Sequence, residues 1–368
     1  MELREPDFSR FRRTLLLEGE PDFVPLFDSV HRDVKSAFLG KPLTDLKGEV
    51  EFAIAAGYDF VMAAVGLQRF FGLGKHSYYG QEASFATKKP ILQAKTAKYS
   101  VFTDAEGERA WAEEGKGNIT TMEEFENFPW PTIKDFDFSL LKTVGEHLPP
   151  GMKVINTVQG VFTPVWLLMG GETFYLSLID NPGLVAKMFD KITTLQYECI
   201  QKIVSFDCLG ALRVNDDIAY KNGLLISPRH LREYFFPWLK EVGKLCERKD
   251  LPFILHTDGN VYEVLDDIID AGVNGLHPIE PSAMDIGYLK KKVGDKLCLL
   301  GGIDVDLMTR GTPEEVEALV RRNLREIAPG GGYIVGASNS VPEYIPLVNY
   351  NAMRETTLNY GGYPISLS

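Results

Sequence analysis

Eight short apolar segments recur along the chain, and polar residues or glycine follow each of them. Amphipathic stretches separate the segments, which is the pattern of βα units around a parallel sheet. Eight such units predict an α/β fold of the (β/α)8 (TIM) barrel type. The segments are residues 23–30, 58–66, 153–160, 208–217, 252–259, 272–281, 297–304 and 331–340.

Two of the intervening stretches carry clear helix signals. Residues 227–250 begin with Ser-Pro, continue with apolar residues at helical spacing and end in a basic turn. Residues 312–331 begin with Thr312 as the expected N-cap and Pro313 at the first helical position, and they end on glycines. These signals favour one helix between successive strands.

Residues 67–150 interrupt this rhythm. They are rich in aromatic, glycine and turn-forming residues, and a structureless loop of that length is improbable in a compact domain. We interpret them as an insertion after the second strand that lids or flanks the barrel mouth. Because 368 residues exceed the roughly 250 of a bare barrel, residues 1–368 are expected to form a single barrel domain, with two independent domains as the alternative.

The composition of the chain excludes several classes of binding partner and cofactor. A net charge of −12 argues against a nucleic-acid surface, and no apolar run approaches a membrane span or a signal peptide. The four cysteines are widely separated and are expected to be reduced thiols of a cytoplasmic protein. No glycine-rich phosphate motif follows a strand, so we expect no nucleotide, flavin or pyridoxal phosphate.

Polar residues end the predicted strands, and in a barrel these ends converge on one face. His256 and Asp258 are two apart and should point the same way, whereas the neighbours Asp216 and Asp217 should point oppositely, with Asp217 nearer the mouth. Glu280 lies between two prolines that stiffen its loop. We therefore predict His256, Asp217, Glu280 and Asp258 as the catalytic residues.

Each of these residues also has a structural interpretation. His256 could act as a general acid or metal ligand, or it could bond a loop carbonyl; His277 could point between strand and helix. Neutral amides can orient a substrate oxygen, and aromatic residues can line a pocket wall, although core packing is their commoner role. The predicted substrate-binding residues are Gln159, Asn215, Asn339, Tyr58, Phe162 and Trp166.

Six phrases, taken in order, resemble the uroporphyrinogen decarboxylase superfamily, which also contains corrinoid-dependent methyltransferases. They are residues 128–138 (FPWPTIKDFDF), 168–191, 214–240, 254–281, 299–316 and 331–353. The resemblance runs through nearly the whole chain and implies the same barrel.

The sequence departs from the decarboxylases and from the zinc methyltransferases of that superfamily. The first loop has one arginine, Arg32, where the decarboxylases have an Arg-rich loop, and the second strand ends without a carboxylate. The zinc enzymes use His-x-Cys and a further Cys, whereas this chain has His256-Thr257-Asp258 and, near its end, Ser338-Asn339-Ser340. A porphyrinogen substrate and a thiol methyl acceptor are therefore both disfavoured.

The remaining resemblance is to the branch that demethylates methyl ethers or methylated amines. It implies a small O-methyl or N-methyl substrate, and a corrinoid (cobalamin) carried by a partner protein as the methyl acceptor. The leaving group would be activated by an acid or by Zn2+, the latter held by His256, Asp217 and Glu280. A decarboxylase acting on a non-porphyrin substrate, and a non-catalytic binding protein on the same scaffold, remain the alternatives.

Overall fold

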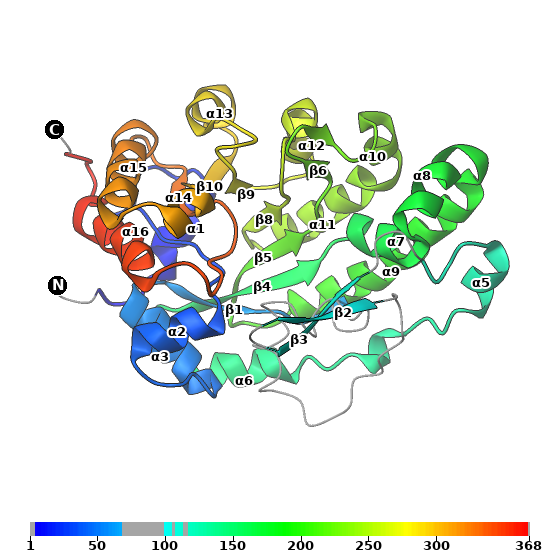
Figure 1. Cartoon of the computed structure of the whole chain (residues 1–368), viewed down its shortest axis with the longest axis horizontal. Coiled ribbons are helices and arrows are strands. Elements are labelled where there is room, and N and C mark those ends of the chain that lie inside the picture. The colour runs from blue at the N-terminus through cyan, green and yellow to red at the C-terminus, as the bar shows by residue number, and fades with distance from the viewer. Residues whose placement is uncertain (1–3, 68–98, 105–106, 113–116, 367–368) are drawn as a thin grey trace.

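Seven parallel strands form one curled sheet (Figure 1). The computed structural model describes residues 4–67, 99–104, 107–112 and 117–366. Neighbouring strands follow the order β1, β4, β5, β8, β9, β10, β11, and each lies inside a predicted segment, which confirms the α/β barrel architecture. The strands are β1 Phe60–Ala63, β4 Lys153–Gln159, β5 Leu209–Asn215, β8 Phe253–His256, β9 Gly275–Ile279, β10 Cys298–Ile303 and β11 Tyr333–Ala337.

The first predicted strand, residues 23–30, takes the eighth place without forming a regular ladder. Leu26 and Val30 make isolated parallel bridges to β11 and to the chain just after it. Between these bridges the Asp28 carboxylate accepts the Ala337 N–H at 2.8 Å. A side-chain oxygen thus takes the place of a backbone carbonyl as acceptor. Residues 23–30 therefore pair with β11 and the chain after it only at isolated bridges.

Helix α1 (Phe8–Leu15) covers the N-terminal end of the barrel. The Phe11 ring centroid lies 5.9 Å from that of Phe27 and 5.2 Å from that of Phe60, the first residue of β1. The Phe27 and Phe60 centroids are 5.5 Å apart. Apolar packing therefore connects the first segment to β1, and burial of these rings stabilises the closure.

Helices alternate with the strands and surround the sheet (Figure 1). Thr312 caps α15 in a capping box, as predicted. Residues 227–250 form two helices instead of one, because Pro237 cannot donate the N–H that a continuous helix requires. The helices are α2 Arg32–Leu39, α3 Leu46–Ala56, α7 Phe162–Met169, α8 Gly171–Asp180, α9 Pro182–Ile203, α10 Pro228–Tyr234, α11 Phe236–Arg248, α12 Leu265–Asp270, α13 Ile286–Val293, α14 Val305–Arg310, α15 Pro313–Glu326 and α16 Leu347–Tyr360.

The described parts of residues 67–150 form elements of their own. Strands β2 (Tyr99–Asp104) and β3 (Gly107–Ala112) pair antiparallel as a separate sheet, and α5 (Met122–Asn127), the short η3 (Ile133–Asp135) and α6 (Ser139–His147) follow. No described residue of this region pairs with a barrel strand, in agreement with an insertion after the second strand. Its predicted role as a lid falls largely on residues 68–98, outside the described residues. Across the described chain, no helix is long and apolar enough to cross a membrane.

Asp28 is a buried carboxyl in the layer between sheet and helices. Besides the Ala337 N–H, it accepts the Tyr58 hydroxyl at 2.8 Å, and the Tyr58 and Tyr350 hydroxyl oxygens are 3.0 Å apart. Burial raises the pKa of Asp28 to about 7, and the two hydrogen bonds only partly offset this shift. The folded state therefore holds a proton on Asp28 at pH values where the unfolded chain has released it.

We predict that Asp28→Asn removes part of the pH dependence of folding. Because the native pKa is raised, wild-type stability from this group is present below pH ~4 and is lost as pH rises towards 7. The amide mimics the protonated acid, so the variant should exceed the wild type by roughly 2–4 kcal/mol at pH 8 and match it near pH 4. Denaturant unfolding at several pH values measures the difference. Tyr58→Phe retains the carboxyl and should retain the slope; an Asp28→Asn slope like the wild type contradicts the prediction.

Candidate functional site

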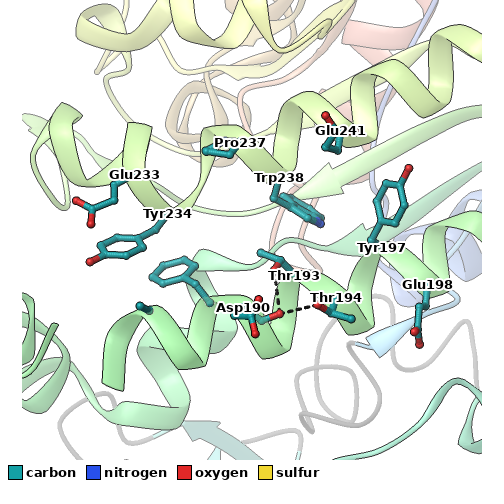
Figure 2. Close-up of a pocket in the computed structure, with 12 residues that line it drawn as sticks. Asp190, Thr193, Thr194, Tyr197, Glu198, Glu233, Tyr234, Pro237, Trp238 and Glu241 are labelled. Atoms are coloured by element: carbon teal, nitrogen blue, oxygen red, sulfur yellow. Dashed lines mark hydrogen bonds between the residues drawn. The ribbon is translucent and has the colours of Figure 1, made fainter. Parts of the chain in front are cut away.

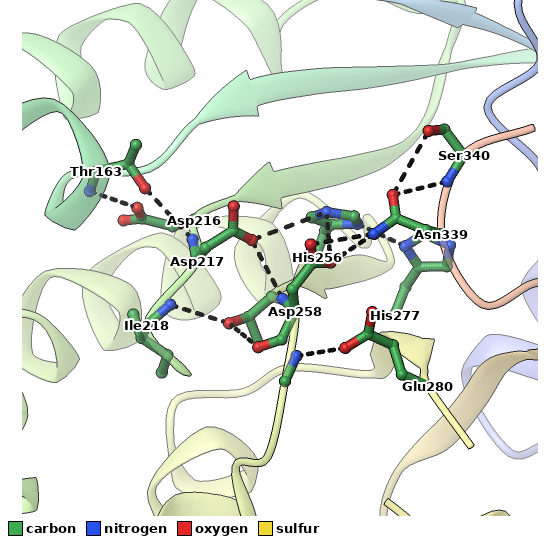
Figure 3. Close-up of polar contacts among 12 residues, drawn as sticks. Thr163, Asp216, Asp217, Ile218, His256, Asp258, His277, Glu280, Asn339 and Ser340 are labelled. Carbon is green, nitrogen blue, oxygen red and sulfur yellow. Dashed lines mark hydrogen bonds and ion pairs between the residues drawn. The ribbon is translucent and has the colours of Figure 1, made fainter. Parts of the chain in front are cut away.

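The ends of three neighbouring strands carry polar side chains at one level. In the parallel ladder Asn215 of β5 pairs with His256 of β8, and His256 pairs with His277 of β9. The chain after β5 and β8 adds Asp217 and Asp258, and these groups converge (Figure 3). The predicted convergence of the strand-end side chains on one face of the barrel is therefore present.

Asp216 and Asp217 follow β5 and have different surroundings. Asp216 is fully buried, and its carboxylate accepts the N–H groups of Val161, Phe162 and Thr163 at 2.6, 2.7 and 2.7 Å. It thereby satisfies the N–H groups that the first turn of α7 leaves without helical partners. The Asp217 side chain is 42% exposed and faces the mouth. Opposite orientation of neighbouring residues thus gives one aspartate to the site and one to the scaffold.

His256, Asp217 and Asp258 form the centre of the site. The imidazole Nε2 lies 3.5 Å from Asp258 Oδ1 and 4.0 Å from Asp217 Oδ1. The Asp258 N–H donates to Asp217 Oδ1 at 3.1 Å, which holds the two acids side by side. Asn339 donates its amide N–H groups to both Asp258 oxygens, at 3.1 and 3.0 Å. The structure therefore brings four of the predicted site residues together.

Glu280 lies beside this centre but is bound elsewhere. Its Oε2 accepts the Gly259 N–H at 2.7 Å. Among the described residues, the side chains whose potential metal-ligating atoms all lie within 4.8 Å of one another are Asp217, His256 and Asp258. The metal set predicted from sequence, with Glu280 in place of Asp258, is therefore not the one that the fold assembles.

Burial controls protonation here. Desolvation, with the negative charges of Asp217 and Glu280, raises the pKa of Asp258 to about 8. Burial also raises the pKa values of Asp217 and Glu280. Burial, and then the charge of Arg213, lower the pKa of His256 well below its usual value. At neutral pH the site thus contains a neutral imidazole beside a protonated carboxyl, and that carboxyl can donate a proton.

The other predicted residues divide into two groups. Gln159 and Asn215 end adjacent strands in register and are half-buried near the level of the site. Tyr58 lies away from the site, in the layer between sheet and helices, where its hydroxyl donates a hydrogen bond to Asp28. Phe162 and Trp166 belong to α7 and pack in or against the hydrophobic core. A substrate-binding role for all five stays a prediction, and the three aromatic residues provide packing in this structure.

Two residues inside the barrel stand outside the predicted catalytic set: His277, which was expected to point between strand and helix, and Arg213, which sequence reasoning missed. His277 is fully buried, and its ring centroid is 4.9 Å from that of His256, so it points into the barrel and not between strand and helix. Arg213 of β5 is also fully buried, and its Nη2 lies 2.5 Å from His256 Nδ1. Its signal was its place two residues before Asn215, on the same face of an otherwise apolar strand.

The cluster fits zinc by its donor types but not by the arrangement of its histidine. One imidazole and two carboxylates are acceptable zinc ligands. A metal-binding histidine almost always donates its second ring N–H to a carboxylate, carbonyl or water. Here the second nitrogen of His256 lies 2.7 Å from His277 Nδ1 and, closer still, 2.5 Å from a guanidinium nitrogen of Arg213, which can only donate. As arranged, the cluster therefore does not suit a zinc ion.

A groove of about 730 Å³ lies away from this site, between α9 and the α10–α11 pair (Figure 2). It is lined by side chains from the outer helices, among them Phe189, Tyr197, Tyr234 and Trp238, and not by strand ends. We place the candidate site at the strand ends, because the acids and histidines with shifted pKa values lie there.

Comparisons with known proteins agree with the barrel fold. The family model described as uroporphyrinogen decarboxylase (URO-D) matches residues 117–360. A uroporphyrinogen decarboxylase from Pseudoalteromonas atlantica is 22% identical over 283 residues, which cover 70% of this chain and 75% of the relative. The methylcobamide:CoM methyltransferase MtaA from Methanosarcina barkeri is 23% identical over 214 residues, which cover 58% of this chain and 60% of the relative.

A solved structure has the same fold over almost the whole chain. It is a methyltransferase from Methanosarcina mazei, with a TM-score of 0.63 and 17% sequence identity. The match covers 97% of this chain and 99% of that chain. At this identity the likeness establishes the fold alone.

The two adjacent aspartates should respond differently to mutation. Asp216→Ala leaves three N–H groups, two of them fully buried, without their acceptor and should lower the free energy of unfolding by roughly 2–4 kcal/mol. Asp217→Ala removes a half-exposed acid that repels Asp258, so its effect should be under about 1 kcal/mol. Denaturant unfolding of both variants at pH 7 measures this difference; equal losses would show that the assignment of the two side chains is wrong.

Proposed function

The chain belongs to the uroporphyrinogen decarboxylase family, and within that family we propose that it is a methyltransferase. It moves a methyl group from a small O-methyl substrate, such as an aryl methyl ether, or from an N-methyl substrate, to a corrinoid protein. The observation that carries this proposal is the position of the Asp258 carboxyl, whose Oδ1 lies 3.5 Å from His256 Nε2 at the barrel mouth and whose pKa burial raises to about 8. Breaking such an unactivated bond requires an acid at the departing heteroatom.

The charge of the mouth disfavours the decarboxylation of an acidic substrate. Its described side chains include Asp217, Asp258 and Glu280. Asp258 is the protonated member of this group, and a further carboxylate would add like charge beside the remaining acids. The arginine of the first loop, Arg32, donates to the backbone carbonyl of Leu43 at 2.8 Å. A neutral methylated substrate suits this surface better than a polycarboxylate does.

Asp258 is the proposed general acid. It gives its proton to the oxygen or nitrogen of the substrate while the bond from that atom to the methyl carbon breaks, and the bonding electron pair stays on the heteroatom. The corrinoid supplies the reduced cobalt that takes the methyl group. Asn339 fixes both oxygens of Asp258, and His256 stabilises the carboxylate left after proton transfer.

The substrate-binding residues and the docking face for the partner are proposed from their places in the barrel. In the sheet register Gln159 pairs with Asn215, and Asn215 pairs with His256; both amides could orient the substrate. The corrinoid protein would dock over the mouth, where residues 67–150 are expected to act as a lid. We propose a cytoplasmic location, since all four cysteines are free thiols.

The acid assignment predicts a change in leaving-group dependence. Asp258→Asn should slow methyl transfer from ordinary aryl methyl ethers by roughly 10²–10⁴-fold. The loss should shrink for ethers of strongly acidic phenols, because those phenolates leave without a proton. Single-turnover methylation of cob(I)alamin by a series of substituted ethers measures both effects.

Asp266→Asn, at an exposed acid on α12, is the matched control and should behave as the wild type. If Asp258→Asn loses the same factor with every ether, Asp258 is not the proton donor. If the wild type methylates no corrinoid from any O-methyl or N-methyl substrate, the methyltransferase proposal itself fails.

A further inference from the structure

A guanidinium is enclosed inside the barrel beneath the site. Arg213 is fully buried, and its Nη1 lies 3.5 Å from Ser29 Oγ and 3.4 Å from Thr157 Oγ1. Its Nη2 lies 2.5 Å from His256 Nδ1 and 3.4 Å from His277 Nδ1. An arginine stays charged in proteins and has only N–H donors. Of the two imidazole nitrogens, His256 Nδ1 is the nearer, so it is the one that accepts from Arg213.

This contact determines the tautomer of His256. A neutral imidazole whose Nδ1 accepts a hydrogen bond carries its proton on Nε2. The Nε2 of His256 lies 3.5 Å from Asp258 Oδ1 and 4.0 Å from Asp217 Oδ1. The imidazole N–H is thus directed at the acids of the mouth, where it can stabilise a negative charge.

His277 can adopt the tautomer that this assignment requires. Its Nδ1 lies 2.7 Å from His256 Nδ1, and since the latter accepts, His277 Nδ1 is the donor. The His277 Nε2 is then unprotonated. That nitrogen is buried without a hydrogen-bond partner in the described part of the chain. A buried acceptor without a partner is tolerated more often than a buried N–H, so the two rings are consistent with each other.

The tautomer bears on metal binding. A metal ion at His256 Nε2 requires that nitrogen to give up its proton. The proton would have to move to Nδ1, where it would meet the N–H of Arg213 across 2.5 Å. Two donors in contact repel, so the metal could bind only if Arg213 withdrew from the imidazole.

We propose that Arg213 is a positioning residue that holds His256 as the neutral Nε2–H tautomer, directs this N–H at the mouth acids, and prevents His256, Asp217 and Asp258 from acting as a zinc site. The inference rests on the acid-assisted methyl transfer proposed above and selects the acid over a metal as its activator. Arg213 itself touches no substrate in this scheme and acts through His256.

The first test observes the tautomer in the unaltered protein. The chain has six histidines, so 15N-histidine labelling with two-bond 1H–15N correlations resolves each ring, and His256→Gln identifies the signal. We expect His256 to be Nε2–H and His277 to be Nδ1–H at pH 7. A proton on His256 Nδ1 would overturn the proposal without any variant of Arg213.

The second test measures Zn2+ binding by calorimetry on the metal-free full chain. Arg213→Met frees the second nitrogen of His256 and should tighten Zn2+ binding by roughly tenfold or more. Adding Asp217→Asn to this variant should abolish the gain. Thr157→Val removes another contact of the guanidinium and should bind Zn2+ as the wild type does. Equal affinity of the wild type and Arg213→Met, or stoichiometric zinc in the purified wild type, would overturn the inference.

Neither measurement uses methyl transfer, so the result is separable from the proposed function. The expected tautomer in a protein that methylates no corrinoid would leave the Arg213 inference standing and remove the function. A methyltransferase with His256 protonated on Nδ1 would do the reverse. Thermal unfolding of each variant confirms that it folds, and where Arg213→Met does not, the wild-type tautomer decides.

Discussion

The in-register parallel pairing of β5, β8 and β9 is the constraint on which the site depends. It puts Asn215, His256 and His277 at one level, and the alternation of side chains puts Arg213 two residues below Asn215 on the same inner face. Backbone hydrogen bonds of the ladder hold these residues in place, so attraction between their side chains is not needed to keep them close. The sheet can therefore keep a cation, two imidazoles and a group of acids together, although desolvation opposes burying any of their charges.

Desolvation then outweighs the direct attraction between these charges. The charge of Arg213 acts to lower the pKa values of Asp217 and Asp258, yet burial raises both. For His256 the two effects act together, and the imidazole stays neutral. The site consequently holds its proton on a carboxyl and not on the histidine. A histidine at a strand end would ordinarily be the first choice as a proton donor near pH 7, and here the order is reversed.

The sequence predicted the strands well, because each is an apolar run of the right length that is buried on both faces. It could not show that residues 23–30 would bond β11 only in part, since the Asp28 carboxylate takes the place of a backbone acceptor. The apolar spacing over residues 227–250 also did not show that the helix breaks before Pro237, although a proline inside a helical pattern indicates such a break. Both differences arise from one side chain or ring that competes with a backbone hydrogen bond.

The candidate site was predictable as far as strand direction determines it, which gave His256, Asp258, Asp217 and Asn339. The partners beneath them were not predictable, because Arg213 and His277 are 64 positions apart and their contact depends on the ladder register. That contact changes what the histidine can do. His256 occupies the position at which the resembling zinc enzymes have a ligand, yet a guanidinium on its second nitrogen favours a hydrogen-bond donor over a ligand. A residue shared with a family therefore does not carry the chemistry of that family unless the group behind it is shared as well.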